Sequence, residues 1–187
     1  MVGFASLYRP YFIEVHRTIM IHVCSLAALP ETVRLTRASH VLTVMGKVDQ
    51  VQRPASIRPE NHLKVSFDDI TEPMDGFVMP SQAHVAQVLD FVRAWDRGAP
   101  LVIHCWAGVS RSTAAAFIAA CALRPHRDEA EIAHAVRANS PTATPNARLV
   151  ALADAMLGRN GRMIAAIEKI GRGHDCFEGA PFALELR

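Results

Sequence analysis

Short apolar runs recur along the first hundred residues and alternate with segments of helical character. Apolar runs of about four to eight residues, bounded by turn or helix signals, are typical of buried strands. The sequence predicts four such strands, at Ile19–Leu26, His40–Met45, Leu63–Phe67 and Leu101–His104. Between the first two, the segment Pro30–Arg34 is typical of the first turn of a short helix, because a proline is followed by an acidic residue.

Helical periodicity is clearest between the third and fourth runs. Apolar residues recur there at positions i, i+3, i+4, i+7 and i+10, namely Val85, Val88, Leu89, Val92 and Trp95. Ser81 is a candidate N-cap and Gly98 a stop signal, so the pattern predicts an amphipathic helix of about four turns over Ser81–Arg97.

The pattern becomes helical throughout after the fourth run. The predicted helices are Ser112–Leu123, Arg127–Ala138, Asn146–Leu157 and a weaker one at Gly161–Ile170. Arg148, Arg159 and Arg162 are interpreted as exposed surface residues. The stretch from residue 171 to 187 receives no assignment.

Strands that alternate with helices, followed by a helical C-terminal part, predict an α/β protein with a mostly parallel central sheet flanked by helices on both faces. In such a sheet a functional site is expected at the C-terminal ends of the strands. No linker, repeat or low-complexity tract divides the 187 residues, so we expect one domain over 1–187 with its core at about 19–170.

Composition narrows the classes of protein further. With 20 Lys and Arg against 18 Asp and Glu, the net charge of +2 gives no broad basic surface for nucleic acid or an anionic membrane. The start of the sequence lacks a signal-peptide pattern, and no run of about 18 apolar residues occurs. We therefore expect a cytoplasmic protein without a nucleic-acid or membrane partner.

The cysteines and histidines do not follow metal-binding patterns. Cys24, Cys105, Cys121 and Cys176 show no C-x-x-C spacing, and the nine histidines show neither H-x-H nor H-E-x-x-H spacing. No metal site and no cofactor are expected. Cys24 and Cys121 fall on apolar faces and are interpreted as inert core residues.

The chemistry is concentrated between residues 101 and 113. A predicted strand ends at His104, a loop follows Cys105, and a predicted helix begins near Ser112. Backbone N–H groups of such a loop and of the first helical turn form an anion site, and the guanidinium of Arg111 adds a fork suited to phosphate oxygens. The same donors favour the thiolate form of Cys105, so nucleophile and anion site are one structure.

These residues resemble the signature of the protein tyrosine phosphatase superfamily, because His104 and Cys105 are followed after five residues by Arg111. The sequence Gly108-x-Ser110-Arg111-Ser112 is most similar to its dual-specificity branch. The resemblance covers roughly residues 40–157 and includes Thr144-Pro145-Asn146 before a late helix.

The resemblance implies roles for the loop and its neighbours. Cys105 would be the nucleophile, and the Ser112 hydroxyl would help its sulfur to leave. The substrate phosphate would bind to the loop residues Trp106, Ala107, Gly108, Val109, Ser110 and Arg111. His104 would orient the loop, and Asn146 would support it besides being a helix N-cap candidate.

The family also uses an Asp about thirty to forty positions before the cysteine as general acid and base. Asp69, 36 positions upstream, is the first candidate, Asp68 the second and Asp75 the third. The segment Thr71–Pro80 would form a lid. Relatives directed at phosphoinositides carry basic residues where this chain has Trp106 and Val109, which argues against a lipid phosphate.

The sequence therefore predicts a metal-independent cysteine phosphatase that hydrolyses phosphate monoesters through a cysteinyl-phosphate intermediate. Its substrate would be a phosphotyrosine protein, with phosphoserine and phosphothreonine also open, or a small phosphate ester such as an inositol phosphate or a nucleotide. An inactive phosphate-binding module is the non-enzymatic alternative. The oligomeric state is not predicted.

Overall fold

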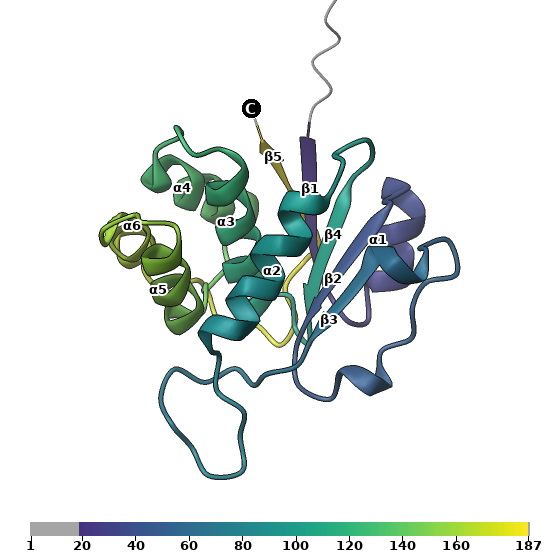
Figure 1. Ribbon diagram of the computed structural model, residues 1–187, viewed down its shortest axis with the longest axis horizontal. Helices are drawn as coiled ribbons and strands as arrows, with labels where there is room; N and C mark the ends of the chain where they lie inside the picture. Colours follow the sequence, from purple (N-terminus) through teal and green to yellow (C-terminus); the bar gives the residue numbers. More distant parts are fainter. Residues whose placement is uncertain (1–18, 187) are drawn as a thin grey trace, which may run out of the picture.

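A five-stranded sheet with the order β3-β2-β4-β1-β5 forms the centre of the computed structural model, which describes residues 19–186 (Figure 1). The strands are β1 Ile19–Ser25, β2 His40–Val44, β3 His62–Val65, β4 Leu101–Cys105 and β5 Phe182–Leu186. Strands β1 to β4 pair in parallel, whereas β5 is antiparallel to β1. The carboxyl ends of the four parallel strands consequently meet at one edge of the sheet.

Helices cover both faces of this sheet, as the sequence predicts. Helix α1 lies on one face and the remaining helices gather on the other (Figure 1). Their bounds are α1 Leu29–Thr36, α2 Gln82–Ala94, α3 Arg111–Leu123, α4 Glu129–Asn139, α5 Ala147–Met156 and α6 Arg162–Ile170. No helix in residues 19–186 is long and apolar enough to cross a membrane.

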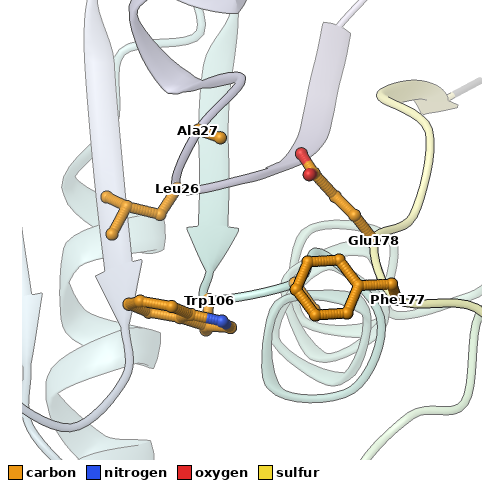
Figure 2. Close-up of a pocket in the computed structure, with 6 residues that line it drawn as sticks. Leu26, Ala27, Trp106, Phe177 and Glu178 are labelled. Atoms are coloured by element: carbon orange, nitrogen blue, oxygen red, sulfur yellow. The ribbon is translucent and has the colours of Figure 1, made fainter.

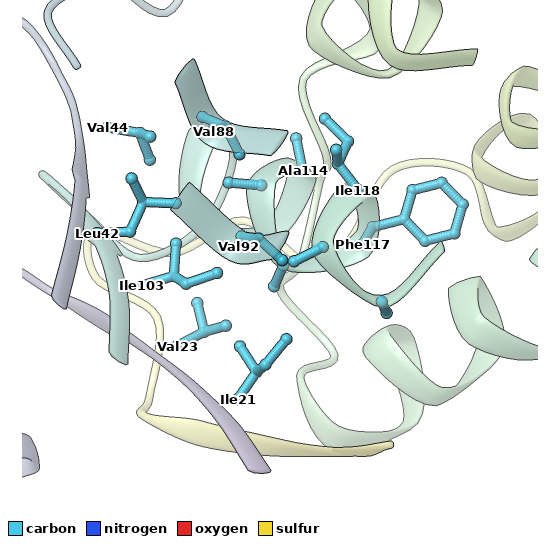
Figure 3. Close-up of a cluster of buried hydrophobic side chains, with 14 of the residues drawn as sticks. Ile21, Val23, Leu42, Val44, Val88, Val92, Ile103, Ala114, Phe117 and Ile118 are labelled. Atoms are coloured by element: carbon cyan, nitrogen blue, oxygen red, sulfur yellow. The ribbon is translucent and has the colours of Figure 1, made fainter. Parts of the chain in front are cut away.

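Helix α3 is the centre of the helical layer. Every residue from position 111 to 121 is buried, because the helix packs between the sheet and the neighbouring helices α2, α4 and α5. Figure 3 shows its apolar side chains beside those of the sheet and of α2; the labelled residues are Ile21, Val23, Leu42, Val44, Val88, Val92, Ile103, Ala114, Phe117 and Ile118. A helix held on all sides fixes the position of the loop that precedes it.

Helix α2 is shorter than predicted and ends at Ala94 rather than at Arg97. Trp95 takes an extended backbone conformation and is 1% exposed, and its indole N–H donates to the carbonyl of Ala99 at 3.0 Å. Because the chain must leave the helix to bury this ring, the helix stops before the glycine signal. The predicted N-cap at its start is confirmed, since the Ser81 hydroxyl accepts from the N–H of His84.

Arg159 is not the surface residue that the sequence suggests. It is 7% exposed, pairs with the buried carboxylate of Glu129 at 3.1 Å, and donates to the carbonyl oxygens of Cys121 and Pro125. Burial of a guanidinium requires such partners. The sequence predicts an exposed side chain because arginine is charged. The prediction was wrong because α3, α4 and the start of α6 converge around Arg159.

The segment after α6, which the sequence leaves unassigned, has a defined course. Phe182, Leu184 and Leu186 alternate with less buried residues in β5 and cover the outer edge of β1. The alternating burial of β5 is typical of a strand. The sequence did not predict it because ten residues without a helix or strand pattern precede it. Those residues, 172–181, lead from the helical layer to the sheet edge past the carboxyl ends of the strands.

Candidate active site

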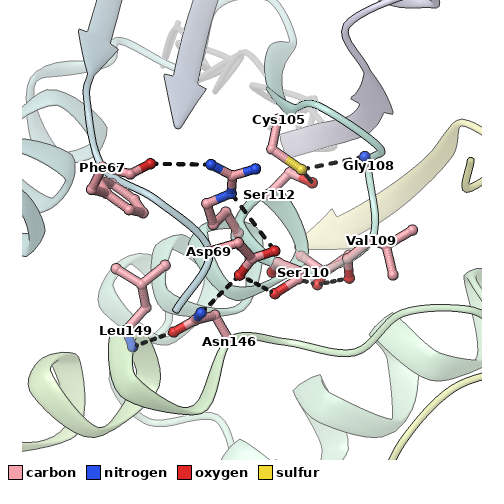
Figure 4. Close-up of polar contacts among 11 residues, drawn as sticks. Phe67, Asp69, Cys105, Gly108, Val109, Ser110, Ser112, Asn146 and Leu149 are labelled. Atoms are coloured by element: carbon pink, nitrogen blue, oxygen red, sulfur yellow. Dashed lines mark hydrogen bonds and ion pairs between the residues drawn. The ribbon is translucent and has the colours of Figure 1, made fainter. Parts of the chain in front are cut away.

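The edge where the parallel strands end brings together the residues that the sequence singles out. Cys105 is the last residue of β4, Arg111 is the first residue of α3, and Asp69 follows β3. The loop of residues 106–110 joins β4 to α3. The end of β4, the start of α3 and the segment after β3 thus supply a thiol, a guanidinium and a carboxylate at one edge of the sheet (Figure 4).

The loop curls over the sulfur of Cys105. The N–H of Gly108 donates to its Sγ at 3.3 Å, and the Ser112 hydroxyl lies 3.1 Å from it. Gly108 has φ +74° and lies against the β1 backbone, where a Cβ would come within 2.8 Å of the carbonyl carbon of Cys24. Only glycine combines this conformation with so close an approach. The tight turn aims the Gly108 N–H at the sulfur.

His104 supports the loop from beneath. It is fully buried, its Nε2 lies 2.7 Å from the Thr43 hydroxyl, and its Nδ1 lies 3.4 Å from the carbonyl oxygen of Cys105. Burial lowers the pKa of His104 to about 4, so the ring is neutral at pH 7. The same hydroxyl also meets Nε2 of His62 at 2.8 Å. These hydrogen bonds hold the His104 ring in one orientation. They favour a role for His104 in supporting the loop over a role in proton transfer.

Arg111 is held as a buried cation at the start of α3. The residue is 9% exposed, and its Nη1 donates to the carbonyl of Phe67 at 3.1 Å. Its Nε is buried without a hydrogen-bond partner among the described residues, and lies 3.7 Å from the Asp69 carboxylate. A buried guanidinium with an unsatisfied donor is suited to an incoming anion.

The two adjacent acidic residues have different surroundings. Asp68 accepts the Val78 N–H at 2.8 Å while its own N–H donates to the Val78 carbonyl at 2.7 Å, which closes the base of the loop that follows. The Asp69 carboxylate instead turns toward the loop of residues 106–110 and Arg111 (Figure 4). Asp75, the third candidate, is exposed within the loop of residues 70–80.

Asp69 is fixed by two hydrogen bonds to one oxygen. The Ser110 hydroxyl donates to Oδ1 at 2.7 Å, and the side-chain amide of Asn146 donates to the same atom at 2.8 Å. Asn146 also caps α5, because its Oδ1 accepts the N–H of Leu149 at 3.0 Å, which confirms the predicted N-cap. The segment before α5 is further tied to the loop by the Thr144 N–H, which donates to the Val109 carbonyl at 2.9 Å.

The remaining loop residues form the rim. Trp106 is 60% exposed and stands at the mouth of the site, and Ala107 accepts the N–H of Gly179 at 2.9 Å. This last contact comes from the C-terminal segment that the sequence leaves unassigned. A further contact from the same segment joins Glu178 to the Ser25 hydroxyl. Sequence reasoning missed these neighbours, because nothing along the chain links them to the loop.

The other cysteines lie outside this arrangement of donors. Burial raises the pKa of both Cys24 and Cys121 to about 12, so their thiols stay protonated. Cys176 is exposed on the C-terminal segment. No group of three or more His, Cys, Asp or Glu in residues 19–186 is placed to hold a metal ion.

The geometry therefore provides three chemical functions at one edge of the sheet. A thiol faces N–H and hydroxyl donors, a buried guanidinium has an unsatisfied donor, and a half-exposed carboxylate lies beside it. Such an arrangement can bind a tetrahedral anion, attack its central atom and exchange a proton with a leaving group.

Comparison with known proteins agrees with this chemistry. The family model for protein-tyrosine phosphatase matches residues 36–141 of the chain. No curated protein sequence gives a significant match.

Solved phosphatase structures share the fold. DUSP15 aligns with a TM-score of 0.60 at 14% identity, covering 80% of this chain and 89% of its own. The Yvh1 phosphatase domain from Chaetomium thermophilum gives 0.60 at 19% identity, with 76% and 93% covered. Human DUSP28 gives 0.57 at 19% identity, with 75% and 89% covered.

The family match spans more than half of the chain and contains both Cys105 and Arg111, while the similar structures place these elements in a dual-specificity-phosphatase-like fold. The chain therefore belongs to the protein-tyrosine phosphatase family and is a hydrolase of that type.

Proposed function

We propose that this protein hydrolyses phosphate monoesters through a phosphate ester of Cys105, without a metal ion. The observation that carries the proposal is the position of the Cys105 sulfur, 3.3 Å from the Gly108 N–H and 3.1 Å from the Ser112 hydroxyl, on the loop that leads to the buried Arg111. These donors stabilise a thiolate and also face the oxygens of a phosphate bound above it.

In the first step the Cys105 thiolate attacks phosphorus in line with the ester oxygen. The S–P bond forms as the P–O bond breaks, and the leaving oxygen takes a proton from Asp69. Arg111 and the loop N–H groups neutralise the charge on the three other phosphate oxygens, the role that metal ions play in other phosphoryl-transfer enzymes. A phosphate that enters the loop competes with Asp69 for Arg111, whose Nε lies 3.7 Å from the Asp69 carboxylate.

In the second step water attacks the phosphorus of the intermediate. Asp69, now a carboxylate, takes a proton from the water, and the S–P bond breaks while the Ser112 hydroxyl donates to the departing sulfur. Inorganic phosphate then leaves and the thiolate is restored. Asn146, Ser110 and His104 act through Asp69 and the loop and are positioning residues.

We infer that the substrate is a phosphorylated protein, with phosphotyrosine as the first candidate. An open cleft of about 630 Å³ lies between residues 69–74 and 144–147, directly beside Asp69. Its size and position support a leaving group attached to a polypeptide, because ligand clefts of about 300–1,000 Å³ receive groups of that bulk. A small phosphate ester would leave most of this cleft empty.

Two further inferences accompany the proposal. The described residues share one hydrophobic core, which supports a single phosphatase domain. All four cysteines are free, and a nucleophilic thiol needs a reducing compartment, which supports a cytoplasmic location.

The proposal is tested by hydrolysis of p-nitrophenyl phosphate in the presence of EDTA. Wild-type protein should turn over, Cys105→Ser should lose activity by at least about 10³-fold, and the exposed control Cys176→Ser should retain it. Acid quenching during turnover of a phosphotyrosine peptide should show phosphate on Cys105 by mass spectrometry. Activity that survives in Cys105→Ser overturns the mechanism, and folded, reduced wild-type protein without activity indicates a phosphate-binding module.

A further inference from the structure

The C-terminal segment of residues 172–181 packs against the loop of residues 106–110, which we call the phosphate loop. The N–H of Gly179 donates to the carbonyl of Ala107 at 2.9 Å, and the carboxylate of Glu178 accepts from the Ser25 hydroxyl. A Cβ on Gly179 would lie 3.2 Å from the carbonyl oxygen of Gly108. The segment is thus packed directly against the loop that follows the nucleophile.

A pocket of about 220 Å³ lies between this segment and the loop. It is lined mainly by apolar groups of Leu26, Ala27, Trp106, Ala107 and Phe177, together with Glu178. Trp106 and Ala107 are the two residues after Cys105, so the pocket adjoins the phosphate site. Because an apolar cavity of about 150 Å³ holds benzene, the space suffices for one large side chain.

Two aromatic side chains stand exposed along this pocket. Trp106 is 60% exposed and Phe177 is 92% exposed. Figure 2 shows the two rings along one side of the opening, with the Glu178 carboxylate on the side nearer Ala27. Exposed rings grouped in this way beside a catalytic loop are typical of a recognition surface.

The charge of the pocket is negative. Among residues 19–186, Glu178 is the only charged residue that lines it, and its hydrogen bond to Ser25 uses one carboxylate oxygen, Oε1. Glu72 is also exposed and lines the cleft beside Asp69. A substrate that carries positive charge beside its phosphate complements this rim.

We propose that this pocket binds the side chain of an arginine or lysine next to the phosphorylated residue of a protein substrate. The inference rests on the proposed function, because it names the class of substrate that the same site receives. The aliphatic stem would lie on Leu26 and Ala27, and the cationic head would meet the faces of Trp106 and Phe177 and the carboxylate of Glu178. An apolar occupant would instead shield the charge of that carboxylate from water with only the Ser25 hydroxyl as its partner, which is unfavourable.

The test measures binding, so that it does not depend on turnover. In a Cys105→Ala background, calorimetry compares three phosphotyrosine peptides that differ only in the flanking residues, which are arginine, leucine or glutamate on both sides. The arginine peptide should bind about fivefold more tightly than the leucine peptide, from one partly exposed ion pair and a cation–π contact. The glutamate peptide should bind most weakly.

Two further variants locate the preference. Adding Glu178→Gln keeps an acceptor for Ser25 but removes the charge, so the arginine-to-leucine ratio should fall to about one. The matched control is Glu60→Gln, which removes an exposed carboxylate next to the amino end of β3, at the far edge of the sheet. The ratio should persist in that variant.

Each other result overturns the inference. A ratio near one in the parent, tighter binding of the leucine peptide, no binding of any peptide, or a ratio that survives Glu178→Gln would each exclude a cation site at this pocket. Failure of the proposed function has a different signature, namely wild-type protein that does not hydrolyse p-nitrophenyl phosphate, whatever the peptides show.

Discussion

The side-chain amide of Asn146 donates a 2.8 Å hydrogen bond to the carboxylate of Asp69, although 77 positions separate the two residues in the sequence. The oxygen of the same amide caps α5 through the N–H of Leu149 at 3.0 Å. One side chain therefore joins the proposed general acid to the start of a helix. The resemblance implies that Asn146 supports the loop besides capping a helix, and the structure adds a direct contact with Asp69.

Asn146→Ser separates the two contacts of Asn146. Serine is also a good N-cap, so the free energy of unfolding should stay within a few tenths of a kcal/mol of wild type, whereas Asn146→Ala should lose about 1 kcal/mol. Both variants lose the donor to Asp69, and their kcat on phenyl phosphate should fall about fivefold. Urea titration and steady-state kinetics measure the two effects. Wild-type kcat in Asn146→Ser would show that the contact does not position the acid.

Asp69→Asn should lower kcat on phenyl phosphate by about 10²–10³-fold, because the leaving oxygen departs without a proton. The loss should be smaller on p-nitrophenyl phosphate, whose leaving group needs less protonation. Asp68→Asn is the matched variant, since its amide oxygen can still accept the Val78 N–H, and its kcat should change by less than about threefold. A larger loss in Asp68→Asn than in Asp69→Asn would reverse the assignment.

The choice between these two acids shows where sequence reasoning ends. Alternation along an extended chain indicates that only one of two adjacent carboxylates can face the cysteine. It does not indicate which one, because the outcome depends on Val78, whose backbone holds Asp68. That contact spans ten residues and arises from the course of a loop without a periodic pattern.

The parts of the fold set by local sequence were predictable. The helices and the four parallel strands lie within a few residues of their predicted bounds, and the loop between Cys105 and Arg111 has the expected strand and helix at its ends. The contact of Glu178 with Ser25 was not predictable, because it depends on the course of residues 172–181, which have no helix or strand pattern. The neighbour of His104 was not predictable either, because Thr43 reaches it only through strand order and pairing register. Nothing in the spacing of these residues specifies that order.

Gly108→Ala should disable the phosphate loop. A Cβ would lie 2.8 Å from the carbonyl carbon of Cys24, at a φ of +74° that costs an L-residue about 1–2 kcal/mol. The loop must move away from β1, so kcat/KM on p-nitrophenyl phosphate should fall at least about tenfold. Gly158→Ala is the control, because it has φ +64° with nothing within 4 Å of its Cβ. In urea titration, Gly158→Ala should lose a similar amount of free energy of unfolding, but it should keep its activity. Equal activities of Gly108→Ala and Gly158→Ala would contradict the argument from the close approach to β1.

Stability should fall as the pH drops through the range in which the buried histidines gain protons. Burial lowers the pKa of both His62 and His104 from 6.5 to about 4. The folded-state pKa lies below the unfolded one, so the unfolded chain binds more protons in this window. The stabilisation is complete above about pH 6.5 and is lost as the pH falls toward about 4.

Urea unfolding at several pH values between about 7 and 4 measures this dependence. His62→Gln should reduce the slope of the free energy of unfolding against pH, because one of the two rings with a lowered pKa is gone. His126→Gln, at an exposed position, should keep the wild-type slope. Identical slopes in all three proteins would contradict a contribution from the buried pair.

The pairing of β5 with β1 has a consequence for the order of folding. Ile19 lies opposite Leu186, so this ladder joins the two ends of the described chain and closes its longest loop. Contacts of such high sequence separation form late, since loop-closure entropy must be overcome first. We expect a growing chain to hold the nucleophile, the arginine and the acid before Phe177 and Glu178 arrive beside them. During synthesis, the residues proposed for catalysis would thus come together before the pocket proposed to select substrates.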